Sequence, residues 1–385
     1  MSLLSYDASE LYDWIASQLD ILILDVRNEK DFNRFKVEGP YPVNILNVSY
    51  YDFMEEEDVS VALIPRDKTI RIVCAQEGSA KYVGEILEKH GFSDVRYLTG
   101  GIKTWGNLLV PKLVNPGEEF ELYQFIRPAK AACSYGLICK DEIMLFDPTR
   151  NVDFYLDFAT QRDVKIIKTF ETHLQADYIA GSRIISEKTG AIFYGHDDFI
   201  NSKIIYTPLK DGDTFSFSAG SPVVKVVHTP GHTPGSTSFI IDDQYMLSGD
   251  AEFIQSIGRP DLGGKAEEWA KLLFRTLQTK LLTFDDNLQV LPGHYMDWSE
   301  ANEDLIFMRS QGEVKKINQA IYSIDNEKDF FQFIKDNMRP QPEEYATIRL
   351  INANLLQEDD EQQEILDLGK NECAATAYAT AQKTA

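Results

Sequence analysis

Residues 171–182 read ETHLQADYIAGS and directly follow the apolar stretch KIIKTF (165–170), which predicts a buried strand. The chain has only six histidines, and four of them stand in short turns rich in Gly, Pro and Thr that come after apolar strands: His173, His228, His232 and His294. Turns at strand ends are where a β-rich scaffold brings side chains from distant parts of the sequence into one site. The pattern therefore predicts a site built from histidine and aspartate.

The sequence around this stretch consists of many short strands. Apolar runs alternate with turns from ELYQFI (121–126) to QYMLSGD (244–250), interrupted by helical stretches such as AEEWAKLLFRTLQTKLLT (266–283). KIIYTPL (203–209) is one of the expected strands, and from residue 300 onward the pattern is mostly helical. The sequence predicts two stacked sheets with helices outside.

Five motifs carry a resemblance to the metallo-β-lactamase fold: DPTRNVD (147–153), ETHLQADYIAGS, HTPGHTPGSTSF (228–239), LSGD (247–250) and LPGH (291–294), in that order. The resemblance implies an αββα sandwich in which metals are held by an H-x-H-x-D-H stretch, a later His, a bridging Asp and a last His. The corresponding positions of this sequence are His173, Gln175, Asp177, Tyr178, His232, Asp250 and His294.

Two of these seven positions do not carry histidine. The two-zinc hydrolases of this fold, such as the glyoxalase II-like thioesterases, use histidine where this chain has Gln175 and Tyr178. An amide and a phenol are poor replacements for imidazole at zinc. His173, His232 and Asp250 remain, and two imidazoles with one carboxylate form the facial triad of non-haem Fe(II) oxygenases.

The persulfide dioxygenases, a branch of the same superfamily, resemble the sequence at these positions and in IGRPDLGG (257–264). The resemblance implies one Fe(II) per chain, or zinc as the alternative, and oxidation of a low-molecular-weight thiol persulfide by O2 to sulfite and thiol. It also implies that Arg259 anchors an anionic substrate and that Asp177 and His294 orient ligands or water. Tyr178 and Gln175 would donate hydrogen bonds near the metal. A zinc thioester hydrolase and a non-catalytic persulfide-binding protein stay open as alternatives.

The first hundred residues differ in character, because strands such as ILILDV (21–26) and TIRIVCA (69–75) alternate with helical stretches, which predicts a parallel sheet flanked by helices. LDVR, the GG pair at 100–101 and Trp105 resemble the rhodanese domain. Cys74 stands at the position of its persulfide-forming cysteine. The loop CAQEGS (74–79) is one residue shorter than C-x-x-G-x-R-S and lacks the Arg. Glu77 is expected to raise the thiol pKa. Both an inactive rhodanese fold and a sulfur acceptor remain open.

The predicted boundaries are a rhodanese-like domain at 1–112, a linker at 113–118, a metallo-β-lactamase-fold domain at 119–375 and a disordered tail at 376–385. Apolar residues make up 43% of the chain, enough for two cores. The net charge of -23 argues against nucleic acid as a partner. The sequence predicts a cytoplasmic protein that does not bind membranes, and the resemblance implies a homodimer. Cys133 and Cys139 are expected in the core; no pattern accounts for Cys373.

Overall fold

The computed structural model describes residues 3–375, and the predicted tail at 376–385 lies outside this range. The chain forms two compact units. Among the described residues, the first unit contains residues 3–110 with the short segments 127–130 and 368–370, and the second contains residues 111–126, 131–367 and 371–375. Within the described residues, no helix is long and apolar enough to cross a membrane.

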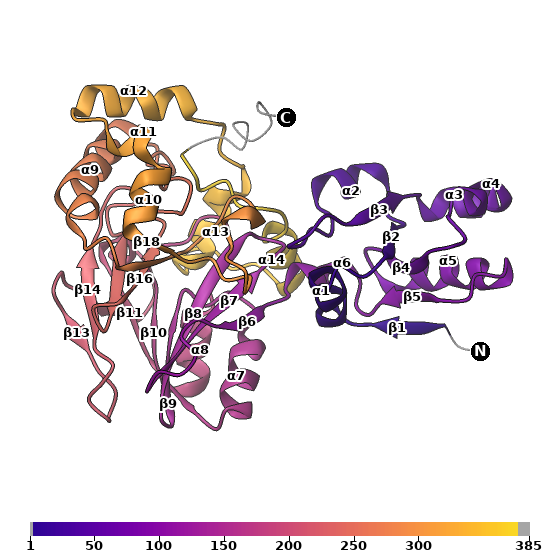
Figure 1. The fold of residues 1–385 in the computed structure, drawn as a ribbon, viewed down its shortest axis with the longest axis horizontal. Helices are drawn as coiled ribbons and strands as arrows, with labels where there is room; N and C mark the ends of the chain where they lie inside the picture. Colours follow the sequence, from indigo (N-terminus) through magenta and orange to yellow (C-terminus); the bar gives the residue numbers. More distant parts are fainter. Residues whose placement is uncertain (1–2, 376–385) are drawn as a thin grey trace. The chain divides into compact units, whose positions relative to one another are not determined.

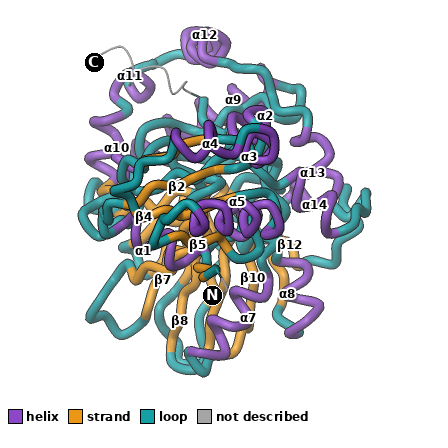
Figure 2. The backbone as a smooth tube through the Cα atoms, turned by 90° about the vertical axis from the view of Figure 1, so that its right-hand side faces the viewer, coloured by secondary structure: helices purple, strands orange, loops and turns teal. Residues whose placement is uncertain are grey.

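The first unit is built on a five-stranded sheet of order β1-β5-β4-β2-β3 in which every recorded pairing is parallel. Its central strands are buried along their length, and Figure 2 shows helix α5 lying along β4 and β5. The predicted parallel sheet flanked by helices is confirmed. The elements of this unit are β1 (Leu4–Tyr6), α1 (Ala8–Ala16), β2 (Ile21–Asp25), α2 (Glu29–Arg34), β3 (Asn44–Asn47), α3 (Tyr50–Glu55), α4 (Glu57–Ala62), β4 (Thr69–Val73), α5 (Glu77–Lys89), β5 (Val95–Leu98) and α6 (Ile102–Gly106).

The second unit contains two mixed sheets. The seven-stranded sheet has the order β12-β11-β10-β9-β8-β7-β6 and the six-stranded sheet has the order β13-β14-β15-β16-β17-β18. The strands are β6 (Val110–Leu113), β7 (Glu121–Arg127), β8 (Ala132–Cys139), β9 (Glu142–Phe146), β10 (Lys165–Phe170), β11 (Ile192–Gly195), β12 (Thr207–Pro208), β13 (Thr214–Phe215), β14 (Val224–His228), β15 (Thr237–Ile241), β16 (Tyr245–Gly249), β17 (Gln289–Pro292) and β18 (Arg309–Ser310).

Helices cover the outer faces of both sheets (Figure 1). Helix α8 contacts β10 and β11, while α9 and α12 pack together in an apolar cluster on the side of the six-stranded sheet. The predicted αββα sandwich is confirmed. The helices are α7 (Val152–Gln161), α8 (Ser182–Thr189), α9 (Ala266–Thr279), α10 (Gln311–Ile317), α11 (Gln319–Tyr322), α12 (Glu327–Asn337), α13 (Glu344–Asn352) and α14 (Asp360–Leu366), with single 3-10 turns at Asp197–Phe199, Leu281–Thr283 and Trp298–Glu300.

Two stretches differ from the expected local structure. Residues 203–209 were expected to form a strand, yet only Thr207–Pro208 pairs with β11. Ile204 and Tyr206 pack against a buried apolar cluster, whereas the side chain of Ile205 between them is 95% exposed. The linker expected at 113–118 directly follows the start of β6 (Val110–Leu113), which forms the edge of the seven-stranded sheet.

Candidate metal centre

His173, His232 and Asp250 come together from three separate strand ends of the second unit. They follow β10, β14 and β16, respectively. Nε2 of His173 lies 3.8 Å from Oδ2 of Asp250, and Nε2 of His232 lies 3.5 Å from the same oxygen. All three side chains are buried, and these three facing atoms have no hydrogen-bond partner. The sequence-predicted triad is therefore brought together in space.

The neighbours of both histidines leave Nε2 available as a metal ligand. Nδ1 of His232 lies 2.8 Å from the backbone oxygen of Arg259, which can only accept, so Nδ1 carries the proton. Nδ1 of His173 lies 2.9 Å from Oγ1 of Thr172, whose hydroxyl donates to Asp147 at 2.8 Å. The hydroxyl therefore accepts from His173. Hydrogen bonds of this kind fix the tautomer and the ring orientation of metal-binding histidines.

The charge states agree with a cation site. Burial lowers the pKa of His173 to about 4 and also lowers the pKa of His232, so both imidazoles are neutral donors at pH 7. Burial alone would raise the pKa of Asp250, but the surrounding histidines outweigh it and hold the pKa well below its usual range. Neutral imidazoles and an ionised carboxylate at this spacing form a buried His/Asp site that fits a metal ion.

Asp177 and His294 lie beside this triad. Nε2 of His294 is 3.0 Å from Oδ2 of Asp177, and Nδ1 of His294 is 2.8 Å from Oδ1 of Asp250. Burial disfavours the imidazolium, but the two carboxylates outweigh burial and raise the pKa of His294 to about 10. One oxygen of Asp250 therefore faces the triad, and the other accepts from His294.

Cys373 joins Asp177 and His294 in a second cluster that sequence reasoning missed. One ligand atom from each of the three residues lies within 4.8 Å of the others, and all three residues are buried. Burial, followed by the charges of Asp177 and Asp250, raises the pKa of the Cys373 thiol well above its usual value. No motif surrounds this cysteine in the sequence, and its distance along the chain from the other ligands hides the contact.

Gln175 and Tyr178 both make hydrogen bonds to Asp147. Nε2 of Gln175 donates to Oδ1 of Asp147 at 3.3 Å, and its side chain lines a cavity of about 330 Å³. The hydroxyl of Tyr178 donates to the backbone oxygen of Asp147 at 3.4 Å, and its ring lies 6.0 Å from that of His294. Both side chains thus donate to Asp147, and Oε1 of Gln175 is buried without a hydrogen-bond partner.

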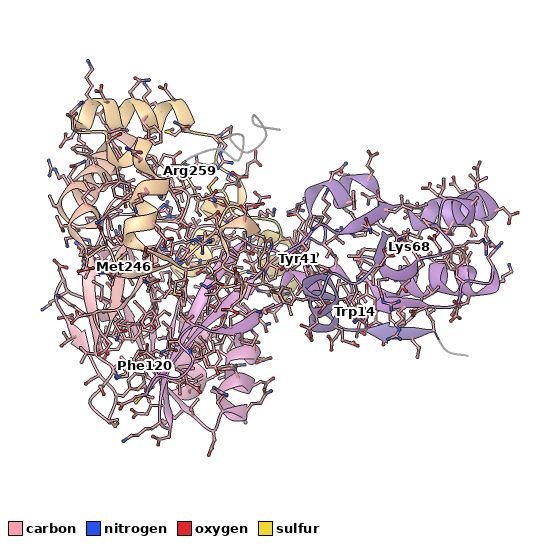
Figure 3. The ribbon with its side chains drawn as sticks, viewed as in Figure 1. Trp14, Tyr41, Lys68, Phe120, Met246 and Arg259 are labelled. Atoms are coloured by element: carbon pink, nitrogen blue, oxygen red, sulfur yellow. The ribbon has the colours of Figure 1, made fainter. Side chains whose placement is uncertain are left out.

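The resemblance implies that Arg259 anchors an anionic substrate, but in the structure its guanidinium binds Asp261. Figure 3 shows it within the second unit, close to the C-terminal helices. Its guanidinium is buried and makes two hydrogen bonds of 2.7 Å to the carboxylate of Asp261, and it also donates to the backbone oxygen of Glu372. Protein groups thus bind the guanidinium. Arg259 contacts the triad through its backbone oxygen, which accepts a hydrogen bond from Nδ1 of His232.

Cys74 lies at the end of β4, where the loop turns into helix α5, and only 4% of it is exposed. The backbone N–H groups of Ala75 and Gln76 and the hydroxyl of Ser79 interact with the thiol and lower its pKa, but burial dominates and the pKa is raised. Gly101 is needed beside this loop, because a Cβ there would lie 2.4 Å from the backbone oxygen of Ala75. Close packing at Gly101 thus accompanies the backbone N–H groups that face the thiol.

Glu77 was predicted to raise the pKa of Cys74; the pKa is raised, with burial as its largest cause. The carboxylate of Glu77 accepts from the backbone N–H of Gly100 at 2.8 Å and from the ammonium of Lys81 at 2.6 Å. The charge that raises the thiol pKa after burial is that of Asp25. Cys133 and Cys139 are buried, as expected for core thiols.

Comparison with known proteins agrees with this architecture. Residues 7–108 match the rhodanese-like domain family, and residues 131–306 match the metallo-beta-lactamase superfamily. An uncharacterized protein of Mycobacterium leprae is 40% identical over 117 residues, 30% of this chain and 48% of that protein. A hydroxyacylglutathione hydrolase of Rhizobium etli is 33% identical over 151 residues, 38% of this chain and 55% of that protein. The chain thus spans about half the length of these relatives.

A persulfide dioxygenase of Bos taurus is 27% identical over 187 residues, 42% of this chain and 64% of that protein. Among solved structures, a metallo-beta-lactamase from Staphylococcus aureus COL aligns with a TM-score of 0.56 and 29% identity, over 62% of this chain and 74% of that chain. ETHE1 from Myxococcus xanthus aligns with a TM-score of 0.52 and 24% identity, over 61% of this chain and 99% of that chain. At this identity the comparison shows a similar fold. The chain combines a rhodanese-like domain with a domain of the metallo-beta-lactamase fold.

Proposed function

We propose that the second domain is an iron-dependent persulfide dioxygenase that oxidises a low-molecular-weight thiol persulfide, such as glutathione persulfide, with O2. The net reaction consumes the persulfide, O2 and water, and yields the thiol, sulfite and two protons. Similarity to the persulfide dioxygenase of Bos taurus supports this reaction. The ligand set supports it as well, because two imidazoles and one carboxylate are typical of non-haem Fe(II) oxygenases.

The division of the two carboxylate oxygens of Asp250 carries the proposal. Oδ2 faces Nε2 of His173 and of His232, whereas Oδ1 accepts from Nδ1–H of His294 at 2.8 Å. A two-zinc hydrolase of this fold uses the aspartate as a bridge between two metals, and its last histidine, at the position of His294, as a ligand of one of them. Here the second oxygen is occupied by a proton donor, which favours a single ion between the triad residues.

His173, His232 and Asp250 would hold this ion in a buried place, and neighbouring groups orient these three side chains. Thr172 and the backbone oxygen of Arg259 orient His173 and His232, and His294 fixes the carboxylate of Asp250. The burial of all three ligands excludes bulk water from the reacting atoms. When bound there, ferrous iron supplies the one-electron chemistry through which O2 reacts with sulfur.

A zinc-dependent thioester hydrolase is the second candidate. Two observations favour it: the similarity to the hydroxyacylglutathione hydrolase of Rhizobium etli, and the position of Asp177 and His294 beside the triad. The two candidates differ in the metal that the triad selects and in their need for O2.

An experiment on the full chain separates them. The protein is purified without added metal, its metals are quantified, and it is assayed with glutathione persulfide in an oxygen electrode and with a glutathione thioester under nitrogen. If the protein is a dioxygenase, the unchanged chain should contain iron, take up O2 with glutathione persulfide and leave the thioester uncleaved. His173→Ala should lack the iron. Zinc in the triad together with thioester cleavage under nitrogen would support the hydrolase and contradict the dioxygenase.

The rhodanese-like domain gives a separate prediction. We expect Cys74→Ser to leave O2 uptake with added glutathione persulfide unchanged, because Cys74 lies in the first unit and the triad belongs to the second. Steady-state O2 uptake of the variant and of the unchanged chain is the measurement. A fall of tenfold or more at saturating persulfide would instead mean that sulfur passes through Cys74 before it is oxidised.

A further inference from the structure

We propose that a cavity in the second unit binds a small primary ammonium compound with an apolar body. The cavity has a volume of about 330 Å³ and lies between the loop after β10, the beginnings of α7 and α8, and the helices α13 and α14. The triad residues His173, His232 and Asp250 are not among the residues that line it. The proposal goes beyond the proposed function, because it concerns a separate ligand and holds whichever reaction the triad supports.

The floor of the cavity, formed by Glu171, Gln175 and Ser182, carries polar atoms whose hydrogen bonds are incomplete. Both carboxyl oxygens of Glu171, Oε1 of Gln175 and Oγ of Ser182 are buried without a hydrogen-bond partner. Gln175 and Ser182 lie close enough to the Glu171 carboxyl group to act on its ionisation, although not in hydrogen-bond geometry. Because buried polar atoms without partners destabilise a protein, a ligand that supplies the missing partners binds favourably here.

Backbone hydrogen bonds hold the floor residues in place. Nδ2 of Asn352 donates to the backbone oxygens of Gln175 and Tyr178 at 2.9 and 2.8 Å. Its Oδ1 accepts from the N–H of Ala180 at 2.9 Å, and Ala180 also forms an antiparallel bridge with Thr149. The loop that carries these side chains is therefore fixed on both sides. A site held in this way loses little conformational freedom when a ligand binds.

The floor offers acceptors, and this defines the head group of the ligand. Oε1 of Gln175 can only accept, the hydroxyl of Ser182 can accept, and the carboxyl group of Glu171 keeps an acceptor oxygen in either protonation state. A primary ammonium group has three donors and no acceptor, so it matches three acceptors on neighbouring side chains. The carboxyl groups of Glu171 and Asp147, which act on each other, favour a positive charge beside them.

The walls of the cavity are apolar and define the rest of the ligand. Phe193 and Phe199 contact each other edge to face, with ring centroids 5.5 Å apart, and belong to one apolar cluster with Leu174. Ile179 and Ile351 belong to a second cluster, and all five side chains line the cavity. Contact with these side chains removes an alkyl or aryl body from water. The walls therefore favour an arylalkyl or alkyl ammonium compound over a polyol.

The basic residues at the cavity do not favour an anionic ligand. Each of them already lies beside an exposed carboxylate, in the pairs Lys188–Asp153, Arg150–Asp360 and Arg183–Glu187. A carboxylate or phosphate ligand would have to compete with these carboxylates and would meet the acceptors of the floor. An ammonium ligand leaves all three pairs intact.

The test titrates the full chain with 2-phenylethylammonium in a calorimeter, with 2-phenylethanol as the neutral analogue and 3-phenylpropionate as the anionic one. We expect one saturable site per chain for the ammonium compound and binding at least tenfold weaker for both analogues. Glu171→Gln should weaken ammonium binding by about 10–100-fold, because a hydrogen bond to a charged partner is lost. Ile184→Trp, which narrows the cavity from helix α8, should weaken it as well.

Each variant has a matched control. Glu252 is also fully buried, and its Oε1 accepts from Gln311 at 3.1 Å, away from the cavity, so Glu252→Gln should bind the ammonium compound as the unchanged chain does. Ile192 is 48% exposed and does not line the cavity, so Ile192→Trp should also bind it normally. His173→Ala should retain this binding, because the ligand does not contact the triad.

Three results would overturn the proposal: no saturable binding to the unchanged chain, equal affinity for the alcohol, or unchanged affinity in Glu171→Gln. Loss of binding in His173→Ala would also contradict it, since the amine would then bind at the metal. Binding is measured without any activity assay, so failure of the dioxygenase proposal leaves this outcome unaffected.

Discussion

We expect a loss of iron affinity of more than about 100-fold in each of three variants, His173→Ala, His232→Ala and Asp250→Ala. Loss of a residue that only orients a metal ligand lowers metal affinity by about 10–100-fold, and loss of a ligand itself should cost more. Each substitution removes one of three ligands, in which Nε2 of His173 and Nε2 of His232 lie 3.8 and 3.5 Å from Oδ2 of Asp250. Persulfide-dependent O2 uptake should fall to background in all three variants. Iron content after gel filtration and O2 uptake are the measurements.

Gln175→Ala is the control for this series, since Gln175 stands in the same loop and is equally buried. Its amide donates to Asp147 and not to the triad, so the variant should retain its iron. Iron loss in Gln175→Ala, or full iron content in His232→Ala, would show that the ligands have been assigned wrongly. Thermal unfolding of each variant separates loss of a ligand from loss of the fold.

Gly258→Ala is expected to disrupt both stability and metal binding. A Cβ at this position would lie 1.9 Å from the backbone oxygen of Asp250 and 2.9 Å from Nδ1 of His232. The backbone of Asp250 cannot rotate away as a side chain can, so the strip 257–259 must move and the contact of His232 with Arg259 is lost. We expect a destabilisation of about 1–3 kcal/mol from overpacking and iron binding weaker by about 10–100-fold.

Gly264→Ala provides the comparison. This glycine has a φ of +73°, and a Cβ there meets no atom within 4 Å, so the change introduces backbone strain without a clash. We expect a cost of about 1–2 kcal/mol and unchanged iron content. Chemical denaturation and metal analysis of the two variants are the measurements. Equal metal content in both would mean that close packing at Gly258 does not position His232.

The fold could be predicted because its strands are marked by local sequence patterns. The buried strand β2 lies at ILILDV (21–26), where the apolar run predicts a strand. The triad was predictable because each ligand follows a strong apolar strand, and strand ends of a sandwich meet on one side. Such signals depend on near neighbours in the sequence.

The remainder of the site depends on contacts that no local pattern encodes. Cys373 reaches the cluster only because the segment 371–375 pairs with residues 257–259, more than a hundred positions earlier. The guanidinium of Arg259 turns to Asp261, two residues away, and Glu77 turns to Lys81. In both cases a nearby residue of opposite charge orients the side chain, and the motifs do not indicate these ion pairs.

The ratio of O2 consumed to sulfite formed, measured with iron-loaded full-length protein and glutathione persulfide, tests the central claim most directly. The proposed reaction predicts one sulfite for each O2, with no product in the absence of O2 and none from His173→Ala. Release of thiol without O2 uptake, or O2 uptake that persists in His173→Ala, would contradict the assignment of persulfide oxidation to the triad of His173, His232 and Asp250.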